Sequence, residues 1–436
     1  MIIYTSLFFN RVGNQSMFET IRGYSKHYNV YIITSSSKEE TYYLDFKKAK
    51  EMLPNNVFFY RTPQFFHTIL RGVFKLINKS NKAKLNVELK KDSTLINLNY
   101  TFWNKMSFKT SYFIQIIFSF YLFITNKIKS PNLICAYEIG GVTASKFINK
   151  FFKKSQLIAK MQGTVLYNYI IKNDINSKSI SLDVEAYNEL KFFDLVTMTN
   201  DGTFGNKVLD YFKVKNENQI FITNGISNFM IRSKEGLIYD HLKNDDTIKI
   251  TTISRLIGWK RVYLTIEVIN EVVNVYNKKN VSLNIYGFGD ENEKLILINL
   301  INKYNLSAYV SLNGSVDYHM VPEILNKSDF LLSLYKMTNV TNPLLEAVYL
   351  NVPIISIEDV NLLNVINNDS KCNNFLFKEM GTEEELIKQV SDFILNLEIE
   401  KIRITRRKII EKGVNPLISW DKRVELEIEI INESCK

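Results

Sequence analysis

Short apolar segments alternate with helical patterns along almost the whole chain, and this alternation restricts the fold more than any other feature of the sequence. The segments include NVYIITSS, NLICAYE and DLVTMTN in the first half, and IKITTIS, VSLNIYGFG and VPIISIE in the second. Continuous apolar runs of this kind are typical of strands buried on both faces, and the intervening helices make right-handed βαβ units. The sequence therefore predicts an α/β fold with parallel, doubly wound sheets.

The length of 436 residues suits two domains of this kind, each of about 200 residues. The alternating pattern fades between Gly225 and Ile248 into a segment of mixed charge. We therefore expect an N-terminal domain at 1–230, a linker at 231–246 and a C-terminal domain at 247–436, whose last helix can pack back on the first domain. Parallel sheets bind ligands at the carboxyl ends of their strands, so the two domains are expected to face each other across a cleft.

The cysteines and the first residues bear on localisation. Cys135, Cys372 and Cys435 are widely spaced, form no metal-binding pattern and leave an odd count, which favours a reducing cytoplasm. The chain begins with the apolar run MIIYTSLFF and shows no basic region of the kind that opens a signal peptide. We expect a cytoplasmic protein.

Positive charge is concentrated in the first half of the chain. Residues 1–230 hold 30 Lys and Arg against 16 Asp and Glu, and residues 51–160 alone hold 17 against 4. A solvated basic surface explains this, and so does a patch that binds an anionic membrane or another polyanion. No recognised nucleic-acid motif accompanies the charge, so we expect an anionic membrane surface and no nucleic acid.

One uncharged stretch, TSYFIQIIFSFYLFITN at 110–126, raises the question of a membrane span. Seventeen residues reach about 25 Å as a helix, short of a bilayer core, and Gln115 and Ser119 dilute the run. The sequence predicts a buried or membrane-leaning helix here and not a span.

Candidate chemistry appears after the strand IKITTIS, in the segment SRLIGWK. Arg255 and Lys260 stand at a strand end and a helix start. There the planar guanidinium of Arg255 and the ammonium of Lys260 can bind the two phosphates of a diphosphate. A pair of surface cations is the alternative. The later segment IYGFGD lacks the third glycine of a dinucleotide fingerprint, so a plain tight turn is expected there.

A second candidate segment is TNVTNPLLEA at 338–347. Pro343 fits the first turn of a helix, and the preceding loop is expected to point free backbone N–H groups at an anion. Glu346, one turn into that helix, can accept two hydrogen bonds from a ribose diol. A buried structural carboxylate is the alternative.

Taken in order, SRL-x-x-x-K, IYGFGD, NGSV and the LLEA helix followed by NVPII resemble the retaining glycosyltransferases of family 4, which have the GT-B fold of two Rossmann-like domains. The resemblance covers 250–357. In the N-terminal half it is looser and rests on the strand order and on PNLICAYE, QGT and NQIFITNGIS. It implies that Arg255 and Lys260 bind the donor diphosphate and Glu346 the ribose. The other donor-binding residues that it implies are Gly13, Val316, Asn339, Val340 and Thr341.

The sequence departs from the family pattern at two positions. Thr338 stands where many members have a Glu that contacts the donor sugar, and Gln162 stands where a His is common. We still expect Thr338 to contact the donor, and Arg255, Lys260 and Gln162 to act in catalysis. The cations would stabilise the leaving diphosphate. No Asp-x-Asp clamp is present, so no metal and no other cofactor is expected.

The resemblance implies a retaining glycosyltransferase that moves a sugar from a nucleotide-diphosphate donor to a glycan or lipid-linked acceptor. Bacterial surface-polysaccharide synthesis is the expected setting, with the protein peripheral on the inner face of the cell membrane. Three alternatives stay open: a non-catalytic GT-B-like scaffold, a GT-B-fold sugar-nucleotide epimerase and a polyanion-binding module. The presence of Arg255, Lys260 and Glu346 favours the transferase, because a scaffold has no need of a diphosphate clamp.

Overall fold

The computed structural model describes most of the chain. The described residues are 1–5, 15–35, 53–63, 102–235, 246–358, 362–363, 374–379, 381–412 and 417–433.

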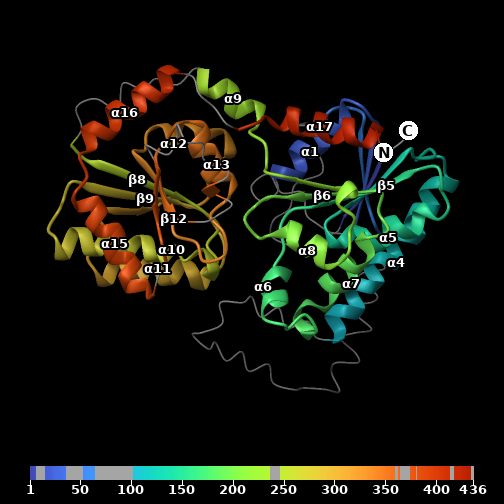
Figure 1. The fold of residues 1–436 in the computed structure, drawn as a ribbon, viewed down its shortest axis with the longest axis horizontal. Helices are drawn as coiled ribbons and strands as arrows, with labels where there is room; N and C mark the ends of the chain where they lie inside the picture. Colours follow the sequence, from blue (N-terminus) through green and yellow to red (C-terminus); the bar gives the residue numbers. More distant parts are fainter. Residues whose placement is uncertain are drawn as a thin grey trace. The chain divides into compact units, whose positions relative to one another are not determined.

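The chain divides into two compact units (Figure 1). The first comprises Met1–Thr223 with Lys422–Lys436, and the second comprises Asn224–Asp421. The expected boundary at 230 therefore falls inside the second unit. Of the expected linker at 231–246, the part up to Glu235 belongs to helix α9 (Asn228–Glu235), and 236–245 lie outside the described residues.

The first unit contains a seven-stranded parallel sheet in the order β3-β2-β1-β4-β5-β6-β7. The direction of winding reverses between β1 and β4, as in a doubly wound fold. Most positions of β1, β4, β5 and β6 are buried, which is why these strands read as continuous apolar runs. The strands are β1 (Ile2–Thr5), β2 (Val30–Thr34), β3 (Val57–Arg61), β4 (Leu133–Tyr137), β5 (Gln156–Met161), β6 (Leu195–Thr199) and β7 (Gln219–Ile222).

Helices cover both faces of this sheet (Figure 1). Successive residues of a strand point to opposite faces, so Ile3 packs with α1 and α17 while Ile2 and Tyr4 pack with the helices of the other face. The helices are α1 (Gln15–Ser25), α4 (Phe102–Ile124), α5 (Ile139–Asn149), α6 (Leu166–Ile171), α7 (Ser181–Leu190), α8 (Gly205–Tyr211) and α17 (Trp420–Glu433), the last of which belongs to this unit from Lys422 onwards.

Helix α4 contains the uncharged stretch of the sequence. Gln115 and Ser119 within this stretch are fully buried against the sheet: the amide of Gln115 donates to Thr5 O over 2.8 Å, and the hydroxyl of Ser119 accepts from Tyr4 over 3.0 Å. No helix among the described residues has the length and hydropathy needed to cross a bilayer. Helix α4 is therefore held by the sheet of its own unit.

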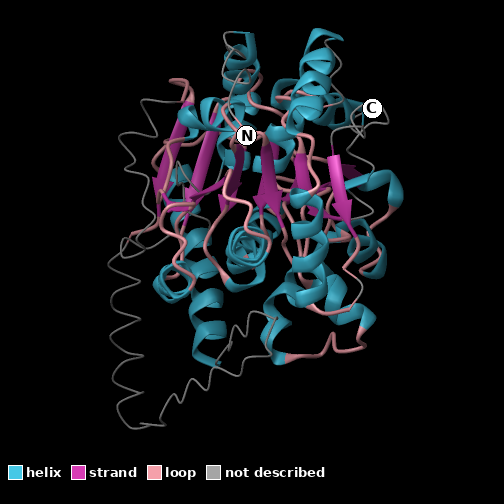
Figure 2. Cartoon of the chain, turned by 90° about the vertical axis from the view of Figure 1, so that its left-hand side faces the viewer, coloured by secondary structure: helices cyan, strands magenta, loops and turns pink. Residues whose placement is uncertain are grey.

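The second unit contains a six-stranded parallel sheet in the order β10-β9-β8-β11-β12-β13 (Figure 2). Helices α10, α11 and α15 pack on one face, and α9, α12 and α13 on the other. The strands are β8 (Ile248–Ile253), β9 (Val281–Tyr286), β10 (Val310–Leu312), β11 (Phe330–Ser333), β12 (Ile354–Ile357) and β13 (Asn374–Phe377), and the further helices are α10 (Val262–Asn270), α11 (Glu291–Lys303), α12 (Val321–Asn326), α13 (Asn342–Tyr349), α15 (Glu383–Leu395) and α16 (Ile399–Lys412).

Two parallel Rossmann-like sheets, each wound with helices on both faces, confirm the predicted α/β class. In both units the carboxyl ends of the central strands lead into loops that carry the residues singled out by the sequence. Those loops are where open α/β sheets bind ligands.

Candidate functional site

The predicted donor residues of the second unit follow the carboxyl ends of adjacent strands. Arg255 follows β8, Val316 follows β10 and Thr338 follows β11, while the GFG segment follows β9. Since β10, β9, β8 and β11 are neighbours in the sheet, these loops emerge along one edge. The sheet order therefore brings together motifs that are up to about eighty residues apart in the sequence.

Arg255 and Lys260 lie on the same loop but in different surroundings. Arg255 is exposed, and its guanidinium has no ion-pair partner among the described residues. Lys260 ends a 3₁₀ turn (Gly258–Lys260) and is buried, with Nζ 4.1 Å from the ring centre of Trp259 and 3.8 Å from that of Tyr335. The ring faces attract the ammonium group and fix its position. The loop thus presents one solvated cation and one desolvated cation.

Contacts between the loops hold this arrangement in place. The hydroxyl of Tyr335 donates to Ile253 O over 3.3 Å, and Lys336 N donates to Trp259 O over 3.1 Å. Burial raises the pKa of the Tyr335 phenol, which keeps the hydroxyl as a donor. One of the two rings that contact Lys260 therefore comes from the loop after β11, which the sequence gave no reason to expect.

Gly287 and Gly289 are required by close backbone packing. Leu256 N donates to Phe288 O over 2.8 Å, and Leu256 forms a parallel bridge with Gly289. A Cβ atom on Gly289 would lie 2.1 Å from Leu256 O, and one on Gly287 would lie 1.7 Å from Ser254 O. Neither glycine has a positive φ. The expectation of a plain tight turn is wrong: the GFG segment continues the pairing of β9 with the chain that leads to Arg255.

Arg261, next to the predicted clamp, has a structural role that the sequence did not reveal. Its guanidinium donates to Leu334 O over 3.1 Å and makes a bidentate pair with Glu379. Its φ of 44° is left-handed and lets the chain turn from the 3₁₀ turn into α10. Arg261 is buried and paired, so it is not a further donor cation.

The loop before α13 is shaped by its own side chains. Asn339 Oδ1 accepts from Ser333 Oγ over 2.9 Å and from Tyr335 N over 3.1 Å. Val340 N donates to Thr338 Oγ1 over 3.1 Å, and Thr341 N donates to Asn339 O over 2.9 Å. The expectation of free amides therefore does not hold for Val340 and Thr341, because both bond within the loop.

Glu346 lies in the second turn of α13 and is 5% exposed. A carboxylate at this depth needs hydrogen-bond partners if it is to stay ionised. Thr341 stands at the N-cap position of α13 without a side-chain cap, and Asn342 Oδ1 accepts from Asn224 Nδ2 over 2.9 Å. A ribose-binding role and a structural role both fit a buried carboxylate, so the assignment to the ribose stays a prediction.

Val316 is partly buried against the same apolar cluster as α13. Its assignment to the nucleobase of the donor also stays a prediction.

In the first unit, Gln162 directly follows β5. Its Nε2 donates to the hydroxyl of Tyr137 over 2.8 Å, and its backbone N donates to Glu138 Oε1 over 2.5 Å. Gly13, the other predicted residue of this unit, lies outside the described residues.

Glu138, which the sequence did not single out, lies between β4 and α5 with φ 60° and ψ 174°. Non-glycine residues rarely adopt this conformation, which costs about 1–3 kcal/mol. Burial of its carboxyl group raises the pKa of Glu138 to about 8 despite the hydrogen bond from Gln162, and the charges of Asp201 and Asp183 add to the effect. In the sequence, Glu138 could have been noticed as an acidic residue between a buried strand and Gly140-Gly141.

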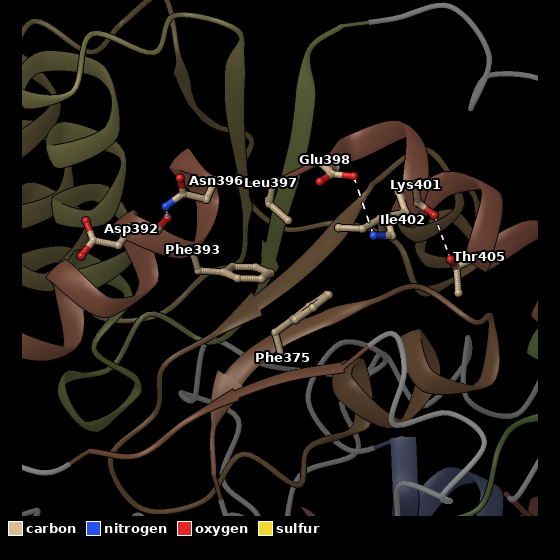
Figure 3. A pocket seen from close by; sticks show the side chains of 9 residues that line it. All are labelled: Phe375, Asp392, Phe393, Asn396, Leu397, Glu398, Lys401, Ile402 and Thr405. Carbon is tan, nitrogen blue, oxygen red and sulfur yellow. Dashed lines mark hydrogen bonds and ion pairs between the residues drawn. The ribbon is translucent and has the colours of Figure 1, made fainter.

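Two cavities lie away from the predicted donor residues. One of about 520 Å³ lies between β13, α15 and α16, where the rings of Phe375 and Phe393 are 4.3 Å apart (Figure 3). The other, of about 740 Å³, lies on α4, α5 and α7 of the first unit. Neither is lined by a predicted site residue. Within the described ranges, no three His, Cys, Asp or Glu side chains are placed to hold a metal ion.

Comparison with known proteins relates this site to one family. Residues 233–414 match the family model described as "Glycosyl transferases group 1". No curated protein matches the chain.

Solved structures match over nearly the full length. They include Anabaena Alr3699/HepE in complex with UDP and glucose (12% identity, 99% of this chain and 99% of that chain, TM-score 0.62). A TarM variant from S. aureus in complex with Fondaparinux, α-GlcNAc-glycerol and UDP matches with 16% identity, 100% and 99% coverage and a TM-score of 0.61. The N-terminal domain of Candida albicans trehalose-6-phosphate phosphatase matches with 14% identity, 99% and 96% coverage and a TM-score of 0.65. At these identities the likeness establishes the fold, which is GT-B. Residues 233–414 thus match the glycosyl transferases group 1 family, and the chain has the GT-B fold.

Proposed function

We propose that the protein transfers a sugar from a UDP-sugar, with retention at the anomeric carbon, to a glycan or lipid-linked acceptor. The observation that carries this is the convergence of Arg255, Lys260 and the loop before α13 at the carboxyl ends of β8 and β11, within the residues that match the family model. The choice of UDP is supported by the HepE and TarM structures, both of which contain UDP.

The chemistry required of the donor site is stabilisation of the leaving group. Breaking the bond between the anomeric carbon and the phosphate oxygen leaves negative charge on the diphosphate. Arg255, exposed and unpaired among the described residues, can offer two parallel N–H donors to phosphate oxygens. Lys260, already desolvated between two rings, supplies a fixed positive charge. Each preorganised contact of this kind is worth about 2–4 kcal/mol in the transition state.

The proposal extends to the membrane. Helix α4 and the segment around α5 present a row of exposed apolar side chains, the α4–α5 surface, made of Phe113, Ile117, Tyr121, Ile124, Phe147 and Phe151. The rings of Phe120 and Phe151, 5.0 Å apart, join its two parts. Exposed lysines lie along it, among them Lys109, Lys127 and Lys150. Apolar side chains rimmed by cations suit an anionic lipid surface. We therefore place the protein at the inner face of a bacterial cell membrane, in surface-polysaccharide synthesis.

The decisive test is turnover of a defined donor panel by the purified protein. UDP-glucose, UDP-N-acetylglucosamine, UDP-galactose, ADP-glucose and GDP-mannose are incubated without acceptor, and release of the nucleoside diphosphate is measured. We expect slow hydrolysis of a UDP-sugar, faster release when membrane lipids are added, and a labelled lipid product. A scaffold would release nothing, and an epimerase would convert the donor without releasing UDP.

A further inference from the structure

The larger of the two cavities, of about 740 Å³, lies entirely within the first unit. Helix α5 packs against both α4 and α7, and all three helices line the cavity. Each helix contributes residues at i, i+3, i+4 and i+7, starting at Lys109 on α4, Thr143 on α5 and Leu182 on α7. This spacing places the four side chains of each helix on one stripe, and seven residues of helix rise about 10 Å. The three stripes form a groove of that length, which we call the three-helix groove.

The middle of the three-helix groove is apolar. Phe113 and Ile116 of α4, Phe147 of α5 and Ala186 of α7 line it. Two of these side chains are unusually open to solvent, since Phe113 is 62% and Phe147 37% exposed. Both also belong to the α4–α5 surface, so the groove adjoins the row of exposed apolar side chains. Apolar walls in a cavity of this size suit the hydrocarbon part of a ligand.

Lysines stand at both ends of the groove. Lys109 is the first residue of the stripe on α4, and Lys150 is the last of the stripe on α5. Lys109 Nζ lies 3.2 Å from the carboxylate of Glu185 on α7, and Lys146 pairs with Glu189. Lys150 is exposed and makes no ion pair among the described residues. The two glutamates of the groove are therefore balanced by two of its lysines, and the third keeps an uncompensated positive charge.

We propose that the three-helix groove binds one anionic phospholipid drawn from the bilayer. The phosphate group binds the ammonium group of Lys150, which lies 5.9 Å from the ring centre of Phe147. The methylene groups next to the head group then pack on Phe147, Phe113 and Ile116. A phospholipid accounts at once for the apolar middle, the uncompensated cation and the neighbouring α4–α5 surface. This inference deepens the membrane part of the proposed function, on which it rests, by adding a site that one lipid fills.

The test uses lipid monomers, so that no bilayer is needed. Binding of dihexanoyl phosphatidylglycerol to the full chain is measured by calorimetry below the critical micelle concentration, and the stoichiometry by native mass spectrometry. We expect saturable binding of one lipid per chain. Dihexanoyl phosphatidylcholine, with the same chains and no net charge, should bind about fivefold more weakly. Glycerol 3-phosphate, which has the phosphate without the chains, should bind at least about tenfold more weakly.

Two substitutions probe the two parts of the site. Thr143→Trp fills the groove from an exposed position on α5 and should weaken binding of the phosphatidylglycerol by at least about tenfold, because the acyl chains lose their burial. Lys150→Glu should weaken it by about tenfold and should affect the phosphatidylcholine much less. Thr125→Trp places the same ring on an exposed position after α4, outside the groove. This matched control should bind like the wild type.

Folding is checked by the melting temperature, which should be little changed because all these positions are exposed. If Thr143→Trp melts lower than the wild type, Asn188→Trp takes its place, since Asn188 is an exposed residue of the groove on α7. Loss of lipid binding in a variant that melts like the wild type supports the groove as the site.

The other outcomes overturn the proposal. Equal binding of the phosphatidylglycerol by the wild type and by the tryptophan variant would exclude the groove. Equal binding of glycerol 3-phosphate would reduce the site to one for free anions, and equal binding of the two lipids would exclude the role of Lys150. A wild type that binds no lipid monomer but sediments with anionic vesicles would keep the membrane association and lose the groove. No nucleotide enters these measurements, so a failure of the proposed sugar transfer would appear separately, in the donor panel.

Discussion

The ammonium group of Lys160 on β5 lies 2.5 Å from Oε2 of Glu427 on α17, and neither side chain is more than 2% exposed. The same carboxylate accepts from the hydroxyl of Tyr24 over 2.9 Å and from Arg423 Nε over 3.3 Å. Arg423 in turn donates to Thr223 O over 2.8 Å. The last helix of the chain therefore completes the core of the first unit through a buried polar network.

Breaking this network from one side should destabilise the first unit. Glu427→Gln leaves the Lys160 ammonium buried without its counter-charge, at an expected cost of about 3–5 kcal/mol in the free energy of unfolding measured in urea. Glu425→Gln, on an exposed position of the same helix, should change it by less than about 0.5 kcal/mol.

The contribution of Glu427 to the stability of the fold should depend on pH in a definite direction. Burial alone would raise the pKa of Glu427, but the charges of Lys160 and Arg423 hold it below its usual value of 4.5. The unfolded state then binds the proton more readily than the folded state. The stabilisation is therefore present above pH 4.5 and is lost as the pH falls through the lower pKa of the folded state. Glu427→Gln should remove this part of the acid dependence, and an unchanged acid profile would contradict the account.

The predicted donor cations, Arg255 and Lys260, can be removed without disturbing the packing around them. Arg255→Ala, and Lys260→Met, which keeps the apolar stem between Trp259 and Tyr335, should each lower kcat/KM by about 10²-fold or more. The melting temperature should be little changed in both. Lys294→Ala, an exposed cation on α11, is the matched control and should retain full activity. Near-normal kcat/KM in both variants would exclude this loop as the diphosphate site.

Glu346 is tested with the nucleotide alone. If the carboxylate holds the ribose diol, Glu346→Gln should weaken UDP binding by about 1–2 kcal/mol, because a charge-assisted hydrogen bond becomes a neutral one. Calorimetry with 2′-deoxy-UDP supplies the control: the wild type should lose affinity for it, and the variant should discriminate less between the two nucleotides. An unchanged Kd for UDP in Glu346→Gln would make Glu346 a structural carboxylate.

Much of the fold follows from local sequence patterns. Strands buried on both faces produce continuous apolar runs, so the alternation of elements predicted two parallel sheets. The polar residues within α4 counted against a membrane span and favoured a buried or membrane-leaning helix, and Gln115 bonds to Thr5 of β1. The predicted donor loops could be singled out because each follows a strand end, which the sequence marks by a change from apolar to polar residues.

What the sequence could not show depends on contacts between distant segments. The need for Gly289 arises only because Leu256 O approaches within 2.1 Å of the position of its missing Cβ. One of the rings in contact with Lys260 is that of Tyr335, which follows a different strand, β11. Glu138 has a backbone conformation that is rare for a residue other than glycine, and the identity of the residue alone does not reveal this conformation. The return of α17 to the first unit was expected from the sequence, but the division after Thr223 and not at 230 depends on contacts between distant segments.

The last prediction concerns the membrane. The α4–α5 surface combines Phe113 at 62% and Ile124 at 80% exposure with neighbouring lysines. Each cation near an anionic bilayer contributes about 1 kcal/mol, and this attraction is screened beyond about 8–10 Å at physiological salt. We therefore expect the protein to co-sediment with vesicles containing anionic phospholipid and not with neutral vesicles, and to be released by about 0.5 M salt.

Two variants separate the contributions to this binding. Lys150→Glu reverses a charge beside Phe147 and Phe151 and should weaken binding most at low salt. Phe113→Ser with Ile124→Ser removes exposed apolar area and should weaken binding at every salt concentration, because burial of apolar surface is not screened. Lys294→Glu, the same charge reversal on α11 of the second unit, should have no effect. If the wild type ignores anionic vesicles at low salt, the lysines are a solvated face and the acceptor is a soluble glycan. If salt fails to release the wild type but releases the double serine variant, apolar insertion of α4 and not charge holds the protein at the bilayer.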